Sequence, residues 1–215
     1  LFGILALTIF ADMTLLEKIG LFCAMGVLNG TIGINYAHEL MHKSGKLERW
    51  LADSLLAMVL YSHFRSEHLL VHHIHVGTPK DPVTARYNES FYSFFNRVLA
   101  QCPISAFNAE TQKLWRKRLP ASHISNPFYI YFSAQLFMIV LSILIGGFFG
   151  LFLFLIQAFV AVLLLELVNY IEHYGLSRKN LENGKYEFVQ PHHSWNSSYK
   201  VSNWVLINLQ RHSDH

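Results

Sequence analysis

Residues 128–170 read FYIYFSAQLFMIVLSILI-GG-FFGLFLFLIQAFVAVLLLELVNY, two long apolar runs that flank Gly146-Gly147. A helix needs about 20 apolar residues to cross a bilayer, and the two runs are close to that length. The glycine pair between them is a turn signal. We therefore predict two crossing helices, over residues 128–145 and 148–172.

The composition of the whole chain agrees with a membrane protein. Hydrophobic residues make up 52% of the 215 residues and charged residues only 14%, whereas soluble domains carry about 25% charged residues. These proportions exclude a disordered chain and argue against an ordinary soluble domain. The formal charge of +3, spread over scattered basic residues, argues against a nucleic-acid binder.

Three further apolar stretches precede these runs. We expect a crossing helix over residues 19–40, in which Gly26 and Gly30 allow close packing in lipid, and a truncated helix over residues 1–11. The stretch over residues 51–66 is too short to cross, so we expect an embedded, non-crossing helix there. Because the chain begins inside an apolar run and stops inside a polar motif, we expect a single membrane domain that is incomplete at both ends.

Lysine and arginine indicate the direction of these helices. All of them except Lys18 lie between Lys43 and Arg118 or from Arg178 onward. Cytoplasmic loops carry an excess of Lys and Arg, so we place these two regions in the cytoplasm. The predicted fold is an all-α, integral membrane helical bundle.

Histidine is frequent, at 13 of 215 residues, although imidazoles are costly inside a membrane. Most of them fall at the ends of separate apolar segments, on the side assigned to the cytoplasm, and several pairs are three or four residues apart. Neutral imidazole is a good ligand for iron, copper, zinc and nickel. We therefore predict a cytoplasmic metal site with the candidate ligands His38, His42, His68, His72, His73, His173, His212 and His215.

Acidic and amide side chains accompany these histidines. Asn35, His38, Glu39 and His42 form one helical stripe, and the same spacing recurs from Glu166 to His173. A metal-bound histidine usually donates its other N–H to a carboxylate or carbonyl, which determines its tautomer. Alternatively, each of these acidic side chains is only a solvated charge at the membrane interface, without a role at the metal site. The candidates for the supporting role are Glu39, Glu67, Asp81, Asn169, Glu172 and Asp214.

Two other kinds of metal protein compete with this interpretation. His38-Glu39-Leu40-Met41-His42 is an H-E-x-x-H string, the signature of zinc proteases. One zinc ion with two histidines and a further ligand leaves most of the histidines without a role, whereas two irons with about four or five nitrogen ligands each would use them all. A metal transporter is the second alternative, but transport sites lie near the membrane midplane.

Three clusters resemble the histidine boxes of membrane desaturases and hydroxylases: His-x3-His at 38–42, His-x3-His-His at 68–73 and His-x2-His at 212–215. Longer strings are more specific, namely Asn169-Tyr-Ile-Glu-His-Tyr-Gly175, Pro191-His-His-Ser-Trp-Asn196 and Leu209-Gln-Arg-His-Ser-Asp-His215. From about Asn35 to its end, the chain resembles the alkane 1-monooxygenases. Xylene-type hydroxylases and fatty acid desaturases are the alternatives that share the boxes.

The resemblance implies a non-haem di-iron enzyme, multi-pass in the bacterial inner membrane, with its site on the cytoplasmic side. Such an enzyme hydroxylates medium- to long-chain n-alkanes to 1-alcohols, using O2 and electrons that rubredoxin receives from rubredoxin reductase. The eight candidate histidines would then hold two iron ions. The third box of the family ends in His-His, and this chain stops after His215, so a ninth ligand is absent. Val71 stands where the family often has Gly and bears no ligand atom.

Two polar clusters remain outside the ligand set. Lys113, Arg116, Lys117 and Arg118 form the densest basic cluster. They either anchor the chain at the cytoplasmic face or dock rubredoxin, which the resemblance implies is acidic. His192 and His193 lie in a string that the family shares, and we expect them to order a loop or support a ligand, with metal binding as the alternative.

Overall fold

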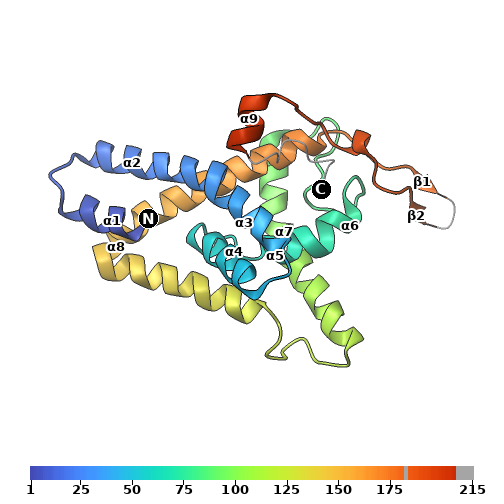
Figure 1. Cartoon of the computed structure of the whole chain (residues 1–215), viewed down its shortest axis with the longest axis horizontal. Helices are drawn as coiled ribbons and strands as arrows, with labels where there is room; N and C mark the ends of the chain where they lie inside the picture. The colour runs from blue at the N-terminus through green and yellow to red at the C-terminus, as the bar shows by residue number, and fades with distance from the viewer. Residues whose placement is uncertain (182–183, 207–215) are drawn as a thin grey trace. The chain divides into compact units, whose positions relative to one another are not determined.

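The computed structural model describes residues 1–181 and 184–206, which are mostly helical. The chain forms two compact units, each built from two separate stretches of sequence. Unit 1 comprises Leu1–Ser62 and Phe128–Leu165, and unit 2 comprises the described part of His63–Pro127 and Glu166–His215. Figure 1 labels the helices and strands of both units.

Unit 1 contains α1 (Phe2–Phe10), α2 (Leu15–Leu28), the π-helical turn η1 (Asn29–Gly33), α3 (Ile34–Met41), α4 (Lys46–Met58) and most of α8 (Phe128–His173). α2 begins where Thr14 and Glu17 form a capping box, which satisfies two backbone N–H groups that the helix leaves without partners. The helix expected over residues 19–40 therefore begins earlier, at Leu15, and continues through η1 and α3 to Met41.

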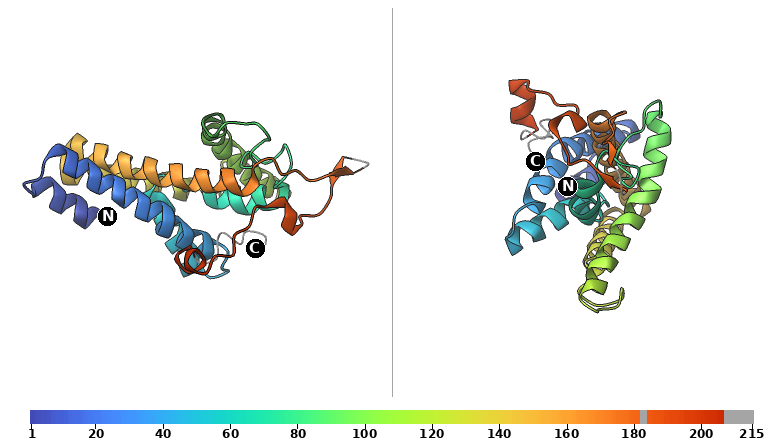
Figure 2. Two further views of the ribbon diagram at one scale, coloured as in Figure 1. Left: turned by 90° about the horizontal axis from the view of Figure 1, so that it is seen from above. Right: turned by 90° about the vertical axis from the view of Figure 1, so that its right-hand side faces the viewer.

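The glycine pair interrupts α8. Gly146 (φ −137°, ψ 18°) and Gly147 (φ 59°, ψ −153°) have non-helical backbones, and the positive φ of Gly147 suits a residue without a Cβ atom. The yellow and orange parts of α8 consequently run in different directions on either side of this point (Figures 1 and 2). The turn that the sequence predicts at Gly146-Gly147 is confirmed.

α2 and the later part of α8 pack side by side in unit 1 (Figure 2). A Cβ atom on Gly26 would lie 2.7 Å from the carbonyl oxygen of Gln157, and one on Gly30 would lie 2.9 Å from that of Ala161. Only glycine permits this approach, so the predicted packing role of both glycines is confirmed. Beside this contact, the half-buried Asn29 donates from Nδ2 to Oε1 of the buried Gln157 at 2.7 Å.

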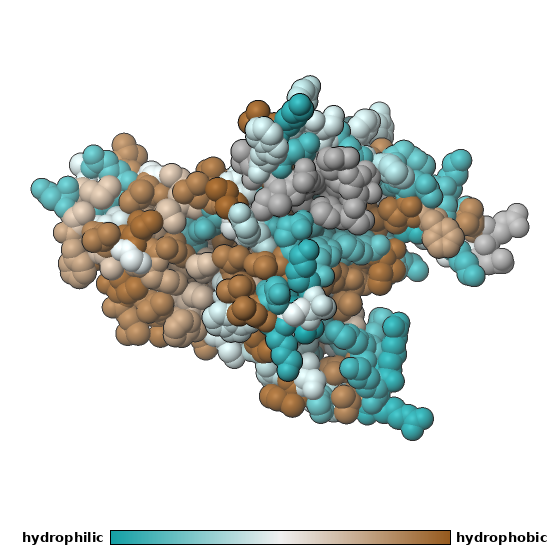
Figure 3. Space-filling model, in the orientation of Figure 1, coloured by the Kyte–Doolittle hydropathy of each residue, from teal (hydrophilic) through white to brown (hydrophobic). Residues whose placement is uncertain are grey.

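The surface of unit 1 carries many exposed apolar side chains. Phe137, Leu144 and Phe148 are 61%, 77% and 84% exposed, and Figure 3 shows apolar residues in brown over much of this unit. Soluble monomers rarely expose apolar patches of such extent. Among the described residues, Leu15–Met41 and Phe128–His173 are long and apolar enough to cross a membrane.

The single helix expected over residues 51–66 is wrong. α4 covers Lys46–Met58, and the chain then turns before α5 begins at Phe64. Leu60 takes a left-handed backbone (φ 55°), and the N–H of Tyr61 donates back to the carbonyl of Leu56. A left-handed residue that returns N–H groups to the last carbonyls is a common way to end a helix.

Unit 2 contains α5 (Phe64–Glu67), the π-helical turn η2 (His68–His72), α6 (His73–His75), α7 (Phe91–Arg116), the end of α8, β1 (Asn180–Leu181), β2 (Lys185–Tyr186), the 3₁₀ turn η3 (Pro191–His193) and α9 (Lys200–Val205). β1 and β2 pair antiparallel. Each strand has only two residues, so the described part of the chain remains mostly helical, in agreement with the expected helical fold.

α7 is a helix of 26 residues that no apolar run in the sequence predicts. Its weakly apolar pattern and the internal Pro103 obscure it, but Ser90 provides an N-cap by accepting from the N–H of Ser93. Phe94 and Val98 on α7 pack with Val83 and Ala85 to form the core of unit 2. This core positions the loop between α6 and α7, which carries Asp81.

Candidate metal centre

The second histidine box lies on a π-helical turn, and this turn determines how its imidazoles are arranged. The N–H of His73 donates to the carbonyl of His68, five residues earlier. In an α-helix, His73 would lie about 140° around the axis from His68, whereas a π turn reduces that angle to roughly 50°. His68 and His73 therefore meet, with 2.9 Å between their Nε2 atoms.

His173, at the end of α8, joins the same cluster in unit 2. Its ring centroid lies 4.8 Å from that of His72, and the His72 ring lies 5.3 Å from that of His68. His68, His72 and His173 are at most 4% exposed. Four of the candidate ligands, from sequence positions about a hundred residues apart, thus form one mostly buried group of imidazoles.

Asp81 supports His72. Nδ1 of His72 donates to Asp81 Oδ2 at 2.9 Å, and the carboxylate also accepts from the Thr84 hydroxyl at 2.7 Å and from the Val83 N–H at 3.0 Å. Burial alone would raise the pKa of Asp81, but neighbouring His72 and these hydrogen bonds hold it below its ordinary value. An ionised Asp81 keeps the proton on Nδ1, so Nε2 of His72 presents its lone pair.

The loop that holds Asp81 is itself tied to α7 by Arg97, a residue that was not among the predicted site residues. Its guanidinium donates to both carboxylate oxygens of Glu89, at 2.9 and 2.6 Å, and to the carbonyls of Pro82 and Thr84. No local motif marks Arg97, because its partners are brought to it by the fold of the loop.

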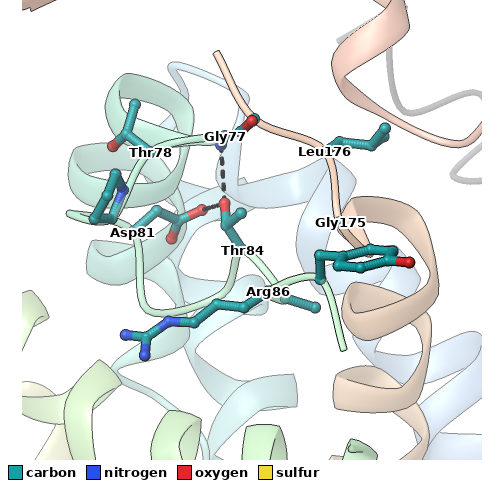
Figure 4. Close-up of a pocket in the computed structure, with 11 residues that line it drawn as sticks. Gly77, Thr78, Asp81, Thr84, Arg86, Gly175 and Leu176 are labelled. Atoms are coloured by element: carbon teal, nitrogen blue, oxygen red, sulfur yellow. Dashed lines mark hydrogen bonds between the residues drawn. The ribbon is translucent and has the colours of Figure 1, made fainter. Parts of the chain in front are cut away.

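A cavity of about 250 Å³ lies beside this loop, between residues 77–87 and residues 175–177 (Figure 4). Asp81 and Thr84 point toward each other at its wall, and the N–H of Gly77 donates to the Thr84 hydroxyl at 2.8 Å. Asp81 itself remains only 2% exposed. Within the part of the chain that the structure describes, the cavity borders the support of His72 and no histidine lines it.

In unit 1, α3 brings the first histidine box together. Nε2 of His42 lies 3.4 Å from Nε2 of His38, and Glu39 Oε1 lies 3.7 Å from His38 Nδ1. His38 is 3% exposed, while His42 is exposed. The i, i+4 spacing on an α-helix accounts for the close imidazoles.

The imidazole pairs have the spacing that a metal ion requires. Two nitrogens that bind one ion at about 2.1 Å lie roughly 3.0 Å apart at a right angle and roughly 3.4 Å apart at a tetrahedral angle. The two Nε2–Nε2 distances, 2.9 Å for His68 and His73 and 3.4 Å for His38 and His42, agree with these values. The residues therefore fit a metal that imidazole favours, of which iron is one.

The remaining predicted supporting residues have varied surroundings. Glu67 is 1% exposed, and among the described residues its Oε1 has no hydrogen-bond partner. Burial raises its pKa well above the ordinary value, and the nearby carboxyls of Asp81 and Glu166 add to the effect. Asn169 Nδ2 donates to Glu166 Oε2 at 3.1 Å, and the backbone carbonyl of Glu172 accepts from the N–H of Trp195.

Other predicted residues lie elsewhere or outside the description. His212, Asp214 and His215 fall beyond residue 206 and so outside the described residues. Of the basic cluster, Lys113 pairs with Glu110 Oε2 at 3.2 Å, and the other three residues stand at or just after the end of α7.

Glu187, His192 and His193 form a further group whose potential ligand atoms lie within 4.8 Å of one another.

Comparison with known proteins agrees with the histidine arrangement. The chain is 42% identical over 198 residues to alkane 1-monooxygenase 2 of Pseudomonas aeruginosa, which covers 92% of this chain and 52% of that protein. It is 42% identical over 201 residues to alkane 1-monooxygenase 2 of Alcanivorax borkumensis, covering 94% and 53%. It is 28% identical over 204 residues to the hydroxylase component of the xylene/toluene monooxygenase of Pseudomonas putida, covering 93% and 53%.

These alignments confirm the resemblance to alkane 1-monooxygenases, and the chain spans about half the length of the curated relatives it matches. The family model described as fatty acid desaturase matches residues 18–215. That match includes all three histidine boxes and most of both units. The chain therefore belongs to the fatty acid desaturase family.

Proposed function

We propose that this chain is the histidine-rich part of a membrane-bound alkane 1-monooxygenase, which converts medium- to long-chain n-alkanes to 1-alcohols at two non-haem irons. The observation that carries the proposal is the alignment of more than nine tenths of the chain with alkane 1-monooxygenases. The group of imidazoles around His72, with its carboxylate support, agrees with a metal-dependent oxidation.

The reaction consumes one alkane, O2, two electrons and two protons, and it yields the 1-alcohol and water. A terminal methyl group has no acidic proton and no leaving group, so acid–base and nucleophilic catalysis by side chains cannot attack it. Bound iron supplies the activation of O2. The contribution of the chain is to hold the ligands, orient them and exclude water.

The proposed ligands are the imidazoles of His38, His42, His68, His72, His73, His173, His212 and His215. Asp81 holds His72 with Nδ1 protonated, which would leave the Nε2 lone pair available to bind a metal. Glu39, Glu67, Asn169, Glu172 and Asp214 are proposed as further supporting groups. The low exposure of His68, His72 and His173 favours a dry site.

The proposed setting is the bacterial inner membrane. The helices over Leu15–Met41 and Phe128–His173 would cross it, the latter twice because of its turn at Gly146-Gly147, and α1 would belong to a further crossing segment. α4 would lie embedded at the cytoplasmic face, where its Trp50 is 64% exposed and suits the interface. Alkanes dissolve in lipid and would enter from the bilayer.

Electrons would arrive from the aqueous side, from rubredoxin and its reductase. Arg116 and Lys117 end α7 and are exposed, so the basic cluster is available either for anchoring or for docking a small acidic protein. Charge complementarity of this kind mainly raises the association rate.

The reaction class is tested with a membrane fraction that contains the full-length protein, supplied with rubredoxin, rubredoxin reductase, NADH and a liquid n-alkane. Mass spectrometry should detect the 1-alcohol under O2, with one labelled oxygen atom when ¹⁸O2 is used. A double bond in an acyl chain would indicate a desaturase, and preferential oxidation of a methyl group on xylene would indicate a xylene-type hydroxylase. Product formation without O2 would refute the proposal.

A further inference from the structure

The segment over residues 190–195 holds the end of α8, where His173 lies. The N–H of Trp195 donates to the carbonyl of Glu172 at 2.8 Å, and Trp195 Nε1 donates to the carbonyl of Tyr174 at 3.1 Å. The last carbonyls of a helix lack partners within the helix. Trp195 thus supplies donors to the backbone on both sides of His173.

The contact that concerns His173 directly is made by a backbone carbonyl. His173 Nδ1 lies 3.4 Å from the carbonyl oxygen of His193. A carbonyl oxygen only accepts hydrogen bonds, so this neighbour favours the tautomer of His173 with its proton on Nδ1. Nε2 then carries the lone pair, and the ring is 0% exposed beside His72.

His193 itself has the opposite tautomer. The backbone N–H of Gln190 donates to His193 Nδ1 at 2.8 Å, so Nδ1 carries the lone pair. The proton of the neutral ring must then lie on Nε2, which is 3.2 Å from Glu187 Oε1. The ring is 2% exposed, and both of its nitrogens are used in holding the segment together.

We propose that residues 190–195 form a clamp that selects the metal-binding tautomer of His173, and that His193 is a positioning residue and not a metal ligand. This inference rests on the proposed function in one respect, that His173 binds iron. It also implies that Glu187, His192 and His193, although close enough to hold a metal ion, do not form a metal site. Within that group, Glu187 and His193 form a hydrogen-bonded support, because Nε2 of His193 faces Glu187 Oε1 and the one lone pair of the His193 ring already accepts from Gln190.

The neighbouring residue His192 provides a matched control. It belongs to the same His-His pair, and its ring centroid is 4.2 Å from that of His193, but its side chain is exposed. Within the segment, the clamp uses His193 and Trp195 and does not use the ring of His192.

The test compares the purified protein with four variants, each loaded with Fe²⁺ alone. His193→Leu removes both ring nitrogens, and His193→Asn retains an acceptor near the position of Nδ1. Trp195→Phe removes the indole N–H and keeps a smaller aromatic ring, and His192→Leu is the control. Iron content, iron release to a chelator and the Mössbauer spectrum are measured. Thermal unfolding shows whether each variant is folded.

We expect His193→Leu to hold part of its iron about 10- to 100-fold more weakly, as is typical when the support of a ligand is lost, and to show a changed Mössbauer spectrum. His193→Asn should recover most of the affinity, Trp195→Phe should lie between these two, and His192→Leu should match the unchanged protein. Recovery by Asn would show that the acceptor for Gln190 matters, which a metal-ligand role of His193 does not predict.

Wild-type iron affinity in His193→Leu would overturn the clamp, as would unchanged affinity in Trp195→Phe if His193→Leu fails to fold. Equal loss of iron in His192→Leu and His193→Leu would mean that the pair itself binds metal, which also overturns it. If the unchanged protein binds no iron, both the proposed function and this inference fail. If it binds iron but forms no alcohol, only the proposed function fails, because the clamp is judged by iron retention.

Discussion

Asp81 Oδ2 lies 2.9 Å from Nδ1 of His72, and both residues are only 2% exposed. The pair lies at the centre of a chain of contacts in unit 2, in which Gly77 N–H donates to the Thr84 hydroxyl and that hydroxyl donates to Asp81. A carboxylate that receives this many hydrogen bonds is held in place and remains charged. The imidazole of His72 is oriented as a consequence.

Loss of this support should weaken metal binding without removing a ligand. Asp81→Ala should lower the iron affinity by about 10- to 100-fold, and Thr84→Val should have a smaller effect in the same direction. Thr78→Val is the matched control, because Thr78 is buried in the same loop but donates to the carbonyl of His75. Titration of the apoprotein with Fe²⁺ measures the difference. Equal effects of the two threonine variants would contradict the assigned role of Thr84.

Replacement of a proposed ligand should have a larger effect. His173→Ala should reduce alkane hydroxylation by at least about 100-fold, together with loss of iron. His123→Ala should keep activity within about twofold, since His123 lies in the loop before α8 and its Nδ1 accepts from the N–H of Ser125. Alcohol production and iron content are measured on the same preparations. Full activity in His173→Ala would reject the ligand set.

The glycines of α2 allow a comparison within one helix. Gly26→Ala should destabilise the protein by about 1–3 kcal/mol, because the new Cβ atom would lie 2.6 Å from Val160 Cβ. Gly20→Ala should leave stability unchanged or raise it by up to about 1 kcal/mol, since apart from its neighbours and the backbone of its own helix, no atom lies within 4 Å of its Cβ position. Thermal unfolding in detergent measures both variants. Similar unfolding temperatures for the two would contradict close packing at Gly26.

The ion pair of Arg97 and Glu89 should make stability depend on pH. Burial raises the pKa of Glu89, but the hydrogen bonds from Arg97 and from the N–H of Arg86 hold it below its ordinary value of 4.5. The stabilisation is therefore complete above pH 4.5 and is lost as the pH falls through the lower pKa of the folded state. Below pH 4.5, the unfolding temperature of the unchanged protein should decrease more steeply with falling pH than that of the Glu89→Gln variant. If the difference between the two unfolding temperatures stays constant across this pH range, Glu89 does not titrate in this way.

The two roles of the basic cluster differ in their kinetics. If it docks rubredoxin, the double substitution Arg116→Glu and Lys117→Glu should raise the KM for rubredoxin by about tenfold at low ionic strength and much less at high salt. The kcat at saturating rubredoxin should not change. Unaltered donor kinetics at low salt, in a protein that still inserts into membranes, would leave anchoring as the function of the cluster.

The sequence by itself determined the helical runs of α8, their turn and the first histidine pair, because each depends on residues close together in the chain. The apolar runs and the glycine pair predicted the helical parts of α8 and their turn, because helix length and backbone freedom depend on residues close together. The i, i+4 spacing likewise brought His38 and His42 together on α3. The break at Leu60 was not predicted, since an apolar run of residues does not show where the backbone becomes left-handed.

Only the tertiary structure decided how distant residues support one another. The sequence identified His68, His72, His73 and His173 as one kind of ligand, but their meeting depends on the π turn and on the packing of α8. Arg97 acts through partners on a separate loop, so no spacing marks it. The tautomers of His173 and His193 are set by a carbonyl and an N–H from other parts of the chain. The chemistry of a side chain limits which hydrogen bonds and metal bonds it can form, whereas the fold determines which partner lies within reach.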